Sequence, residues 1–143
     1  MSAEKVKDGY KIPNSHSIVR FLKTHLYFDG MMVSVDFWKL KSNEEYLSCM
    51  WYEYRNKDTG KIKNDIKKLL KGRLEGGYLP IQCIEDIQGI AKKHGLMGVH
   101  ARFQGNKTKT AHAGLYNTSN DNLFLSEMAM ETSRIIKQQQ VKI

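Results

Sequence analysis

The sequence predicts an α+β domain in which a small mixed or antiparallel sheet begins with an N-terminal hairpin and carries helices packed on one side. The length of 143 residues suits a single domain, residues 1–143, with a buried core. The composition, 41% hydrophobic and 27% charged residues, is typical of a globular protein. The apolar periodicity along the chain indicates the order β-β-α-α-β-α-β-β-α.

Residues 17–40 predict the N-terminal hairpin. The segments "SIVRFLKTHLYF" and "MMVSVDFWKL" flank Asp29-Gly30. Asp-Gly is a favoured two-residue hairpin turn because both positions tolerate positive φ. In the second segment Val33, Val35 and Phe37 alternate with polar or mixed residues, as expected for a strand with one buried face.

The next segment, "SNEEYLSCMWYEYR", is predicted to be a helix, with a strand as the alternative. Ser42 and Glu45 have the spacing of a capping box. The residues that share one helical stripe are Leu47, Met50, Trp51 and Tyr54. A strand over "YLSCMWYEY" stays open because aromatic residues favour strands. In the helical interpretation Trp51 is buried against the sheet.

A basic amphipathic helix follows in "TGKIKNDIKKLLKGRLEGG". Its apolar stripe consists of Ile62, Ile66, Leu69 and Leu70, and the lysines lie off that stripe. Gly76-Gly77 is expected to end the helix. The segment "YLPIQCI" then predicts a strand. Pro80 indicates either that this strand lies at a sheet edge or that the proline lies at its start.

The last third of the chain predicts a helix, a strand pair and a closing helix. "EDIQGIAKKHG" has acidic residues first and basic residues last, as the helix dipole prefers, and Gly95 ends it. "LMGVHARF" and "AHAGLY" are expected to pair around the loop "QGNKTKT". The final helix begins at Asn120 or Asp121. Residues 1–14 and 137–143 are expected to be loosely ordered.

The two cysteines, Cys49 and Cys83, have no paired spacing, which indicates reduced thiols in the cytoplasm. The first residues lack the apolar stretch of a signal peptide, and no segment has the apolar length of a membrane span. We therefore expect a cytoplasmic protein with no membrane partner.

The formal charge of +8 is concentrated in one part of the chain. Eight basic and two acidic residues lie between Arg55 and Arg73. Such a concentration of positive charge attracts anions, including nucleic acid. The expected anion-binding residues are Lys63, Lys67, Lys68, Lys71, Arg73, Lys107 and Lys109. The alternative is that these lysines only keep the outer face of the helix solvated.

No Walker loop, G-x-G-x-x-G, C-x-x-C, H-E-x-x-H or G-x-S-x-G is present, so the signatures of the corresponding ATPases, dehydrogenases, zinc proteins and serine hydrolases are missing. His100 and His112, without a nearby carboxylate pair, do not form a recognisable zinc ligand set. We expect neither a metal nor another cofactor.

His100 and His112 are the candidate acid and base. Eleven residues lie between them, so a hairpin can pair the two directly with both rings on one face of the sheet. Arg102 has the same strand parity as His100 and shares that face. Two histidines and an arginine can catalyse phosphodiester cleavage by proton transfer and charge neutralisation. In the alternative, each histidine packs at a sheet edge and bonds to the backbone.

Several stretches together resemble an uncharacterised group of small bacterial proteins. The group's pattern is a histidine before V-x-R-Y, then L-S-V-N-W-L-E, V-x-H and H-A-x-I. The matching stretches here are "HSIVRF", "LSCMWYE", "GVH" and "HAGL", and Cys49 and Met50 depart from the pattern. No activity is established for this group, so the resemblance implies no function. It does group His16, Arg20, Glu53, His100 and His112 as a candidate constellation.

The sequence thus predicts a basic accessory protein that binds an anionic partner, either nucleic acid or a nucleotide. One alternative is a metal-independent phosphodiesterase or ribonuclease with His100 and His112 as acid and base. In that enzyme Arg102 or Arg20 stabilises the transition state and Glu53 orients a histidine. Another alternative is a structural subunit whose basic helix binds an acidic protein partner.

Overall fold

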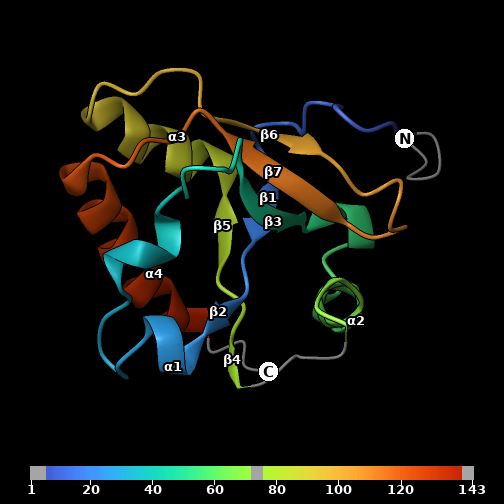
Figure 1. Ribbon diagram of the computed structural model, residues 1–143, viewed down its shortest axis with the longest axis horizontal. Coiled ribbons are helices and arrows are strands. Elements are labelled where there is room, and N and C mark those ends of the chain that lie inside the picture. Colours follow the sequence, from blue (N-terminus) through green and yellow to red (C-terminus); the bar gives the residue numbers. More distant parts are fainter. Residues whose placement is uncertain (1–5, 72–75, 140–143) are drawn as a thin grey trace.

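The computed structural model describes residues 6–71 and 76–139 and confirms the α+β class. A five-stranded antiparallel sheet has the strand order β5-β1-β3-β7-β6, and a two-stranded sheet pairs β2 with β4 (Figure 1). The strands are β1 (Ser17–Val19), β2 (Leu22–Lys23), β3 (Leu47–Trp51), β4 (Gly77–Tyr78), β5 (Ile81–Cys83), β6 (His100–Phe103) and β7 (His112–Tyr116). The helices are α1 (Thr24–Tyr27), α2 (Thr59–Leu69), α3 (Ile84–Lys93) and α4 (Asn122–Gln139), with 3-10 turns η2 (Val35–Trp38) and η3 (Glu53–Arg55).

The strand register divides the side chains of the large sheet between two faces. Alternate residues such as Ile18, paired with Trp51, point to the face that carries α3 and α4. The main core on this face joins strand residues such as Leu115 to helix residues such as Ile87 and Phe124. We call this side the helix-covered face.

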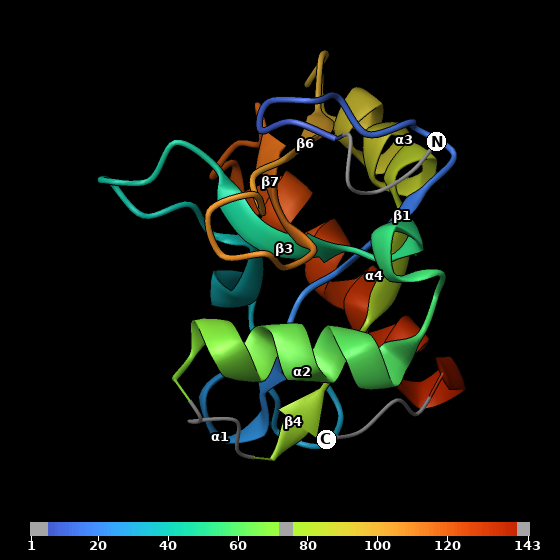
Figure 2. The same ribbon diagram turned by 90° about the vertical axis from the view of Figure 1, so that its right-hand side faces the viewer.

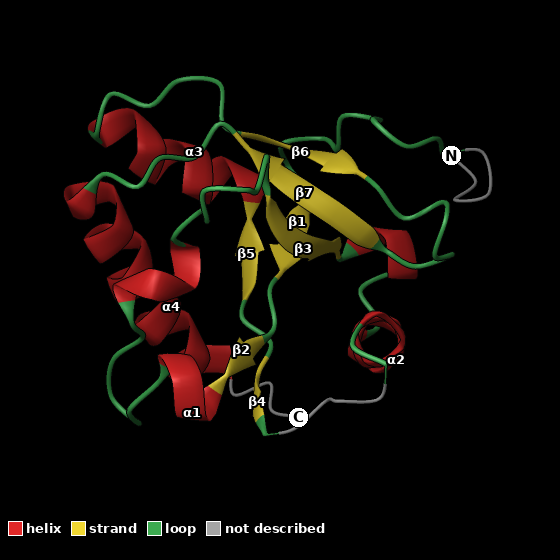
Figure 3. Ribbon diagram, in the orientation of Figure 1, coloured by secondary structure: helices red, strands yellow, loops and turns green. Residues whose placement is uncertain are grey.

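Helix α2 packs on the opposite face, so the expectation of helices on one side is wrong for this helix. Its Ile62 and Ile66 form a second cluster with Val19 and Met50, which point away from α3 and α4. The apolar stripe of so short a helix needs cover, and these two strand residues supply it. Figures 1 and 3 show α2 on the other side of the sheet from α3 and α4, and Figure 2 shows it across the front.

The predicted N-terminal hairpin over residues 17–40 is wrong, although its turn exists. The Asp29 carboxylate accepts the N–H groups of Met31 and Met32, and Gly30 has φ +96°. The first flanking segment contains β1, β2 and α1, and the second contains η2; beside the turn the two segments share the isolated antiparallel bridge Phe28–Val33, but β1 and β2 pair with other strands. The indole of Trp38, within η2, donates to Thr132 of α4 at 2.8 Å. The Val33 N–H also donates to Ser133 of α4, and these two bonds to a distant helix outweigh the local strand pattern.

The residues predicted as a helix at 42–55 contain the strand β3, so the strand alternative was right. Pairing with β1 on one side and β7 on the other satisfies the backbone of β3. The predicted capping box of Ser42 and Glu45 is absent. Instead, the Glu44 carboxylate accepts the backbone N–H of Lys41. Trp51 is buried as expected, with 6% of its surface exposed, but from a strand.

Several other predictions are confirmed. The α2 helix begins behind Asp58, whose side chain accepts the Lys61 N–H, and buries Ile62 and Ile66. Strand β5 is an edge strand, and β6 pairs with β7. Gly95, with φ +75°, follows α3. Asp121 precedes α4 and accepts the Phe124 N–H.

Three expected boundaries need correction. Helix α2 ends at Leu69, before the predicted Gly76-Gly77, and Gly77 belongs to β4. Residues 9–12 form backbone hydrogen bonds with β6, so this part of 1–14 is ordered. Residues 137–139 continue α4, where Gln139 bonds to the Ile81 backbone. None of the described helices combines the length and hydrophobicity needed to cross a membrane.

Candidate functional site

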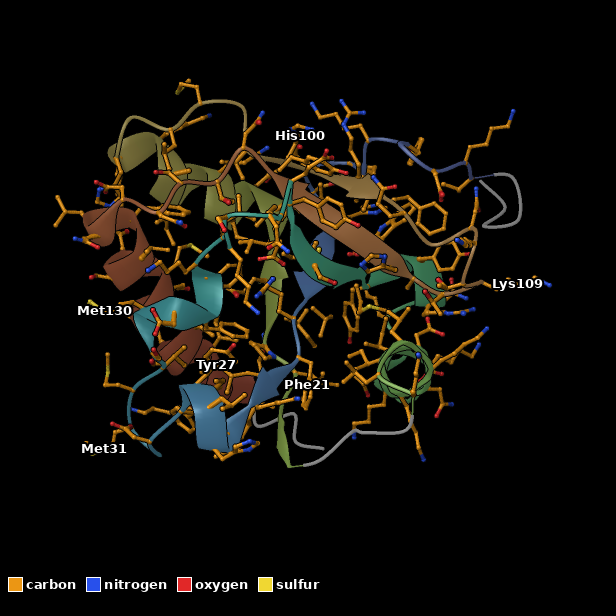
Figure 4. All side chains as sticks on the ribbon, in the orientation of Figure 1. Phe21, Tyr27, Met31, His100, Lys109 and Met130 are labelled. Atoms are coloured by element: carbon orange, nitrogen blue, oxygen red, sulfur yellow. The ribbon has the colours of Figure 1, made fainter. Side chains whose placement is uncertain are left out.

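The open part of the sheet, opposite α3 and α4 and beside α2, carries a cluster of aromatic and polar side chains from three strands. We call this cluster the ring face; its residues are Tyr46, Ser48, His100, Arg102, Gln104, His112 and Tyr116. Each of them is at least partly exposed to solvent. Figure 2 shows β3, β6 and β7, which carry or adjoin these residues, above α2. Figure 4 shows His100 at the far edge from α2.

Aromatic rings form a continuous run across the ring face. The ring centroids of Tyr46 and Tyr116 lie 5.1 Å apart, and His100 stacks on Tyr116 at 5.4 Å with an interplanar angle of 13°. His112 extends the run, 6.1 Å from Tyr46. A Cβ atom on Gly114 would lie 2.4 Å from the Tyr46 ring. Glycine at this position therefore lets the Tyr46 ring lie directly on the strand backbone.

Hydrogen bonds hold His100 in one neutral form. Its Nδ1 lies 2.8 Å from the carbonyl oxygen of Gly98, which can only accept, so Nδ1 carries the proton. Its Nε2 accepts from Nε of Arg102 at 2.9 Å. Arg102 also donates to the Gly9 carbonyl and forms no salt bridge with any described residue. The positive charge of Arg102 is therefore available to an external anion.

His112 forms a hydrogen-bonded pair with Ser48, whose Oγ lies 2.9 Å from Nε2 of the ring. Burial lowers the pKa of His112 below its usual value of 6.5 because it disfavours the charged ring. His112 is therefore neutral at pH 7. The described residues place no carboxylate on this ring, so the pair lacks the third group that orients the base in a hydrolase triad.

His100 and His112 share one face, as expected, but the predicted direct pairing is wrong. His100 pairs with Tyr116, four residues along β7 from His112, which is about 13 Å at the usual rise of a strand. The hairpin is centred on Thr108, and its turn requires glycine at position 105, where a Cβ would clash with the Thr110 carbonyl oxygen. Acid and base must both reach the same phosphodiester, and these two rings are too far apart for that.

Arg20 satisfies backbone carbonyl groups where β1 diverges from β3. Its two terminal nitrogens donate to the carbonyl oxygens of Ser48 and Phe37, each at 2.7 Å. The guanidinium also lies over the rings of Phe37 and Trp38, with centroid distances of 4.8 and 5.2 Å. Burial lowers the pKa of Arg20. Arg20 therefore stabilises the sheet through these carbonyl groups, on the side of β3 opposite to β7.

Arg20 also lines a groove of about 370 Å³ between α1 and α2, with β3 at its floor. Lys23 and Lys41 line the same groove, and Ser48 connects it to the ring face. In Figure 4, Phe21 lies between the two-stranded sheet and α2. The groove thus extends the open surface toward the basic helix.

His16 and Glu53 lie together, but not on the ring face. His16 Nδ1 accepts from the indole nitrogen of Trp51 at 2.9 Å. Glu53 accepts from the Ser17 N–H at 2.9 Å. Trp51 points to the helix-covered face, away from His112. The candidate constellation is therefore divided into three groups: His16 with Glu53, Arg20 alone, and His100 with Arg102 and His112.

The predicted anion-binding lysines form a basic edge beside the ring face. Lys67, Lys68 and Lys71 are exposed on and just after α2, and Lys63 is half-buried. The exposed Lys107 and Lys109 lie in the β6–β7 loop. Figure 4 shows Lys109 at the same edge of the molecule as α2. We call these six lysines the basic edge; Arg73, also predicted, lies outside the described residues.

Asp65 is the residue that sequence reasoning missed at this edge. Its buried carboxylate accepts from Nε and Nη2 of Arg55, at 2.7 and 2.9 Å, and from the Ala111 N–H at 2.9 Å. Arg55 also donates to the Lys109 carbonyl. These bonds join α2 to the β6–β7 loop. The available signal was an acidic residue between Ile62 and Ile66 on an otherwise apolar stripe.

Tyr46, Gly114 and Tyr116 were also missed. Alternation in "HAGLY" places His112, Gly114 and Tyr116 on one face, which is a usable signal. Tyr46 reaches this face only because β3 pairs with β7. Within residues 6–71 and 76–139, no three His, Cys, Asp or Glu side chains are grouped so that they could hold a metal ion.

Comparison of the chain with protein-family models, curated proteins and solved structures found no match.

Proposed function

We propose that the protein binds single-stranded nucleic acid, with unpaired bases stacked on the ring face and phosphates bound at the basic edge. The observation that carries this proposal is the partly exposed run of rings formed by Tyr46, Tyr116 and His100. Aromatic side chains on a sheet surface are an established means of stacking bases in single strands.

The arrangement favours a single strand over a duplex because stacking on protein rings needs unpaired bases. The stacked rings of His100 and Tyr116 are partly exposed to solvent, and neutral His100 adds no desolvation cost of a buried charge. Arg102, with no carboxylate partner among the described residues, can donate to a phosphate or a base. The net charge of +8 supports attraction of the phosphate backbone.

Two other functions receive less support. A ribonuclease with His100 and His112 as acid and base needs the two rings near one phosphate, and the strand register separates them. A structural subunit that binds an acidic protein would use the lysines but would not need the rings. Substitution of the rings therefore distinguishes nucleic-acid binding from protein docking.

The proposal is tested by fluorescence anisotropy with a labelled single strand of about 16 nucleotides, the upper site size for one small binding module. Tyr46→Leu and Tyr116→Leu should each weaken binding by roughly 5- to 150-fold, because a stacked base contributes about 1–3 kcal/mol. Tyr78→Leu is the control, since this half-buried tyrosine belongs to the two-stranded sheet and packs on Phe28. Unchanged binding by both ring-face variants would contradict the proposal.

The contribution of the basic edge is tested with two charge-matched double variants. Lys67 and Lys68 lie in the last turn of α2, and Lys92 and Lys93 occupy the same place in α3, on the other face of the sheet. Changing either pair to glutamate alters the net charge equally. We expect only the α2 variant to weaken binding strongly and to reduce its salt dependence. Equal effects of both pairs would indicate attraction by net charge alone.

A further inference from the structure

A second cavity, of about 420 Å³, lies at the end of β3 and is separate from the ring face. Its lining includes Tyr10, His16, Trp51, Glu53, Tyr54 and Asn56. Trp51 is the last residue of β3, and its side chain points to the helix-covered face. The cavity therefore opens on a different part of the molecule from Tyr46 and Tyr116. The volume falls within the range of about 300–1,000 Å³ that small-molecule sites have.

Aromatic rings form one wall of this cavity. Tyr10 stacks on Trp51, with centroids 5.7 Å apart and an interplanar angle of 23°. Tyr54 lies 5.7 Å from Trp51 on another side. Such a wall offers a planar ligand the offset or edge contacts that aromatic groups prefer.

The Trp51 indole leaves His16, which lines the cavity, with a free hydrogen-bond donor. An indole N–H can only donate, so Nδ1 of His16, at 2.9 Å, must be the unprotonated nitrogen. The neutral ring then carries its proton on Nε2. In the described part of the chain, Nε2 of this cavity-lining ring has no hydrogen-bond partner.

Glu53 supplies an acceptor beside this donor. Its Oε1 accepts the Ser17 N–H at 2.9 Å, which orients the carboxylate. The other oxygen, Oε2, has no partner among the described residues, and Glu53 forms no salt bridge with them. The cavity lining therefore includes one donor and one acceptor that have no partner among the described residues, next to an aromatic wall.

We infer that this cavity binds a nucleobase, with His16 donating to a ring nitrogen or carbonyl and Glu53 accepting an N–H of the same edge. Proteins that take a base out of its strand read it in this way, by edge hydrogen bonds and aromatic contacts. The choice of a nucleobase over another planar heterocycle rests on the proposed function, whereas the donor, the acceptor and the aromatic wall do not.

The backbone at the rim also departs from relaxed geometry. Asn56 and Lys57 have φ of +53° and +59°, so two successive residues other than glycine adopt the left-handed region. Such residues cost free energy and are concentrated at binding sites. Here the turn brings Asn56 to the cavity.

The inference is tested by NMR of the protein with ¹⁵N-labelled tryptophan. The two indole signals, assigned with Trp38→Phe, belong to Trp38 and Trp51. Millimolar adenosine, guanosine, cytidine and uridine 5′-monophosphates are titrated separately. At least one should shift the Trp51 signal in a saturable way, while Trp38, which donates to Thr132 in the core, stays unchanged. Ribose 5-phosphate, which lacks a base, should shift neither.

Glu53→Gln should weaken the binding of the tightest-binding nucleotide by about tenfold or more. The amide can place an N–H group where the Oε2 acceptor of Glu53 was, and this group cannot accept the N–H of the base. Glu44→Gln is the matched control, since Glu44 also accepts a backbone N–H, that of Lys41, but does not line the cavity. The Glu44→Gln variant should bind the nucleotide as tightly as the wild type.

The inference is overturned if none of the four nucleotides shifts Trp51, or if ribose 5-phosphate shifts it equally. It is also overturned if Glu53→Gln, with an otherwise unchanged spectrum, binds as tightly as the wild type. If oligonucleotide binding still depends on Tyr46 and Tyr116 in that case, the proposed function stands and only this inference fails. If Trp51 responds while oligonucleotides do not bind, the cavity inference stands and the proposed function fails.

Discussion

Replacing Asp65 with alanine should weaken the attachment of the basic helix to the β6–β7 loop. The carboxylate is buried, with 8% of its side chain exposed, and it accepts two hydrogen bonds from Arg55 and one from the Ala111 N–H. Asp65→Ala removes all three. The Arg55 guanidinium then loses its counter-ion, and the buried amide of Ala111 loses its acceptor.

The expected loss of unfolding free energy is about 3 kcal/mol. A hydrogen bond to a charged group contributes roughly 1.5–3 kcal/mol, and an unsatisfied buried N–H costs about 1–3 kcal/mol. The Arg55 side chain is 28% exposed, so water recovers part of its solvation, and we take the lower half of the first range. The result lies at the lower end of the roughly 3–5 kcal/mol found when one partner of a buried ion pair is removed.

Urea unfolding followed by circular dichroism measures this loss as a lower midpoint with an unchanged slope. Asp58→Ala is the control, because Asp58 caps the same helix through the Lys61 N–H and should cost only about 1 kcal/mol. A cycle with Arg55→Met should give a coupling of about 1–2 kcal/mol between Arg55 and Asp65. If Asp65→Ala costs no more than Asp58→Ala, or if the coupling is zero, the assignment of Asp65 as the anchor of α2 is refuted.

Four further outcomes are expected. Trp51→Ala should lower the unfolding free energy by about 3–5 kcal/mol in urea titrations, since this buried ring packs on three aromatic neighbours; a variant as stable as wild type would contradict its place in the core. Gly114→Ala should weaken oligonucleotide binding because its Cβ displaces the Tyr46 ring, and unchanged anisotropy would show that this ring is not used. The pKa of His112 is lower in the folded than in the unfolded protein, so the unfolded state binds more protons between the two values. The stability from His112 should therefore be complete above about pH 6.5 and lost as pH falls toward the folded value, and His112→Gln should flatten this part of the profile. Burial raises the pKa of Cys49 to about 12, so iodoacetamide near pH 8 should alkylate the half-exposed Cys83 and spare Cys49, as peptide mass spectrometry would show.

Local chemistry explains what could be predicted along the chain. The Asp58 cap and the apolar stripe of Ile62 and Ile66 indicate α2 without reference to any other element. In the same way, Asp121 indicates the start of α4, and Asp29-Gly30 indicates the turn that these residues form. In each case the bonds involved span only a few residues, so the sequence itself contains both partners.

The ring face could be predicted only in part. Strand alternation placed His100, Arg102 and His112 on one face, and the structure agrees. Their spacing along the strands depends on where the hairpin is centred, and the pairing of β6 with β7 sets this register. His16 could not be placed by pattern at all, because its position depends on a hydrogen bond to Trp51, 35 residues away.

Local sequence patterns were enough to predict the α+β class, the helices α2, α3 and α4, the β6–β7 pair and the concentration of positive charge. Three features depend on long-range contacts: residues 47–51 form a central strand, α2 covers the face opposite α3 and α4, and Tyr46 lies on Gly114. The physical reason is the range of the interactions. Caps, turns and periodicity act between neighbours in the chain, whereas strand register and the choice of a sheet face depend on partners that folding alone brings together.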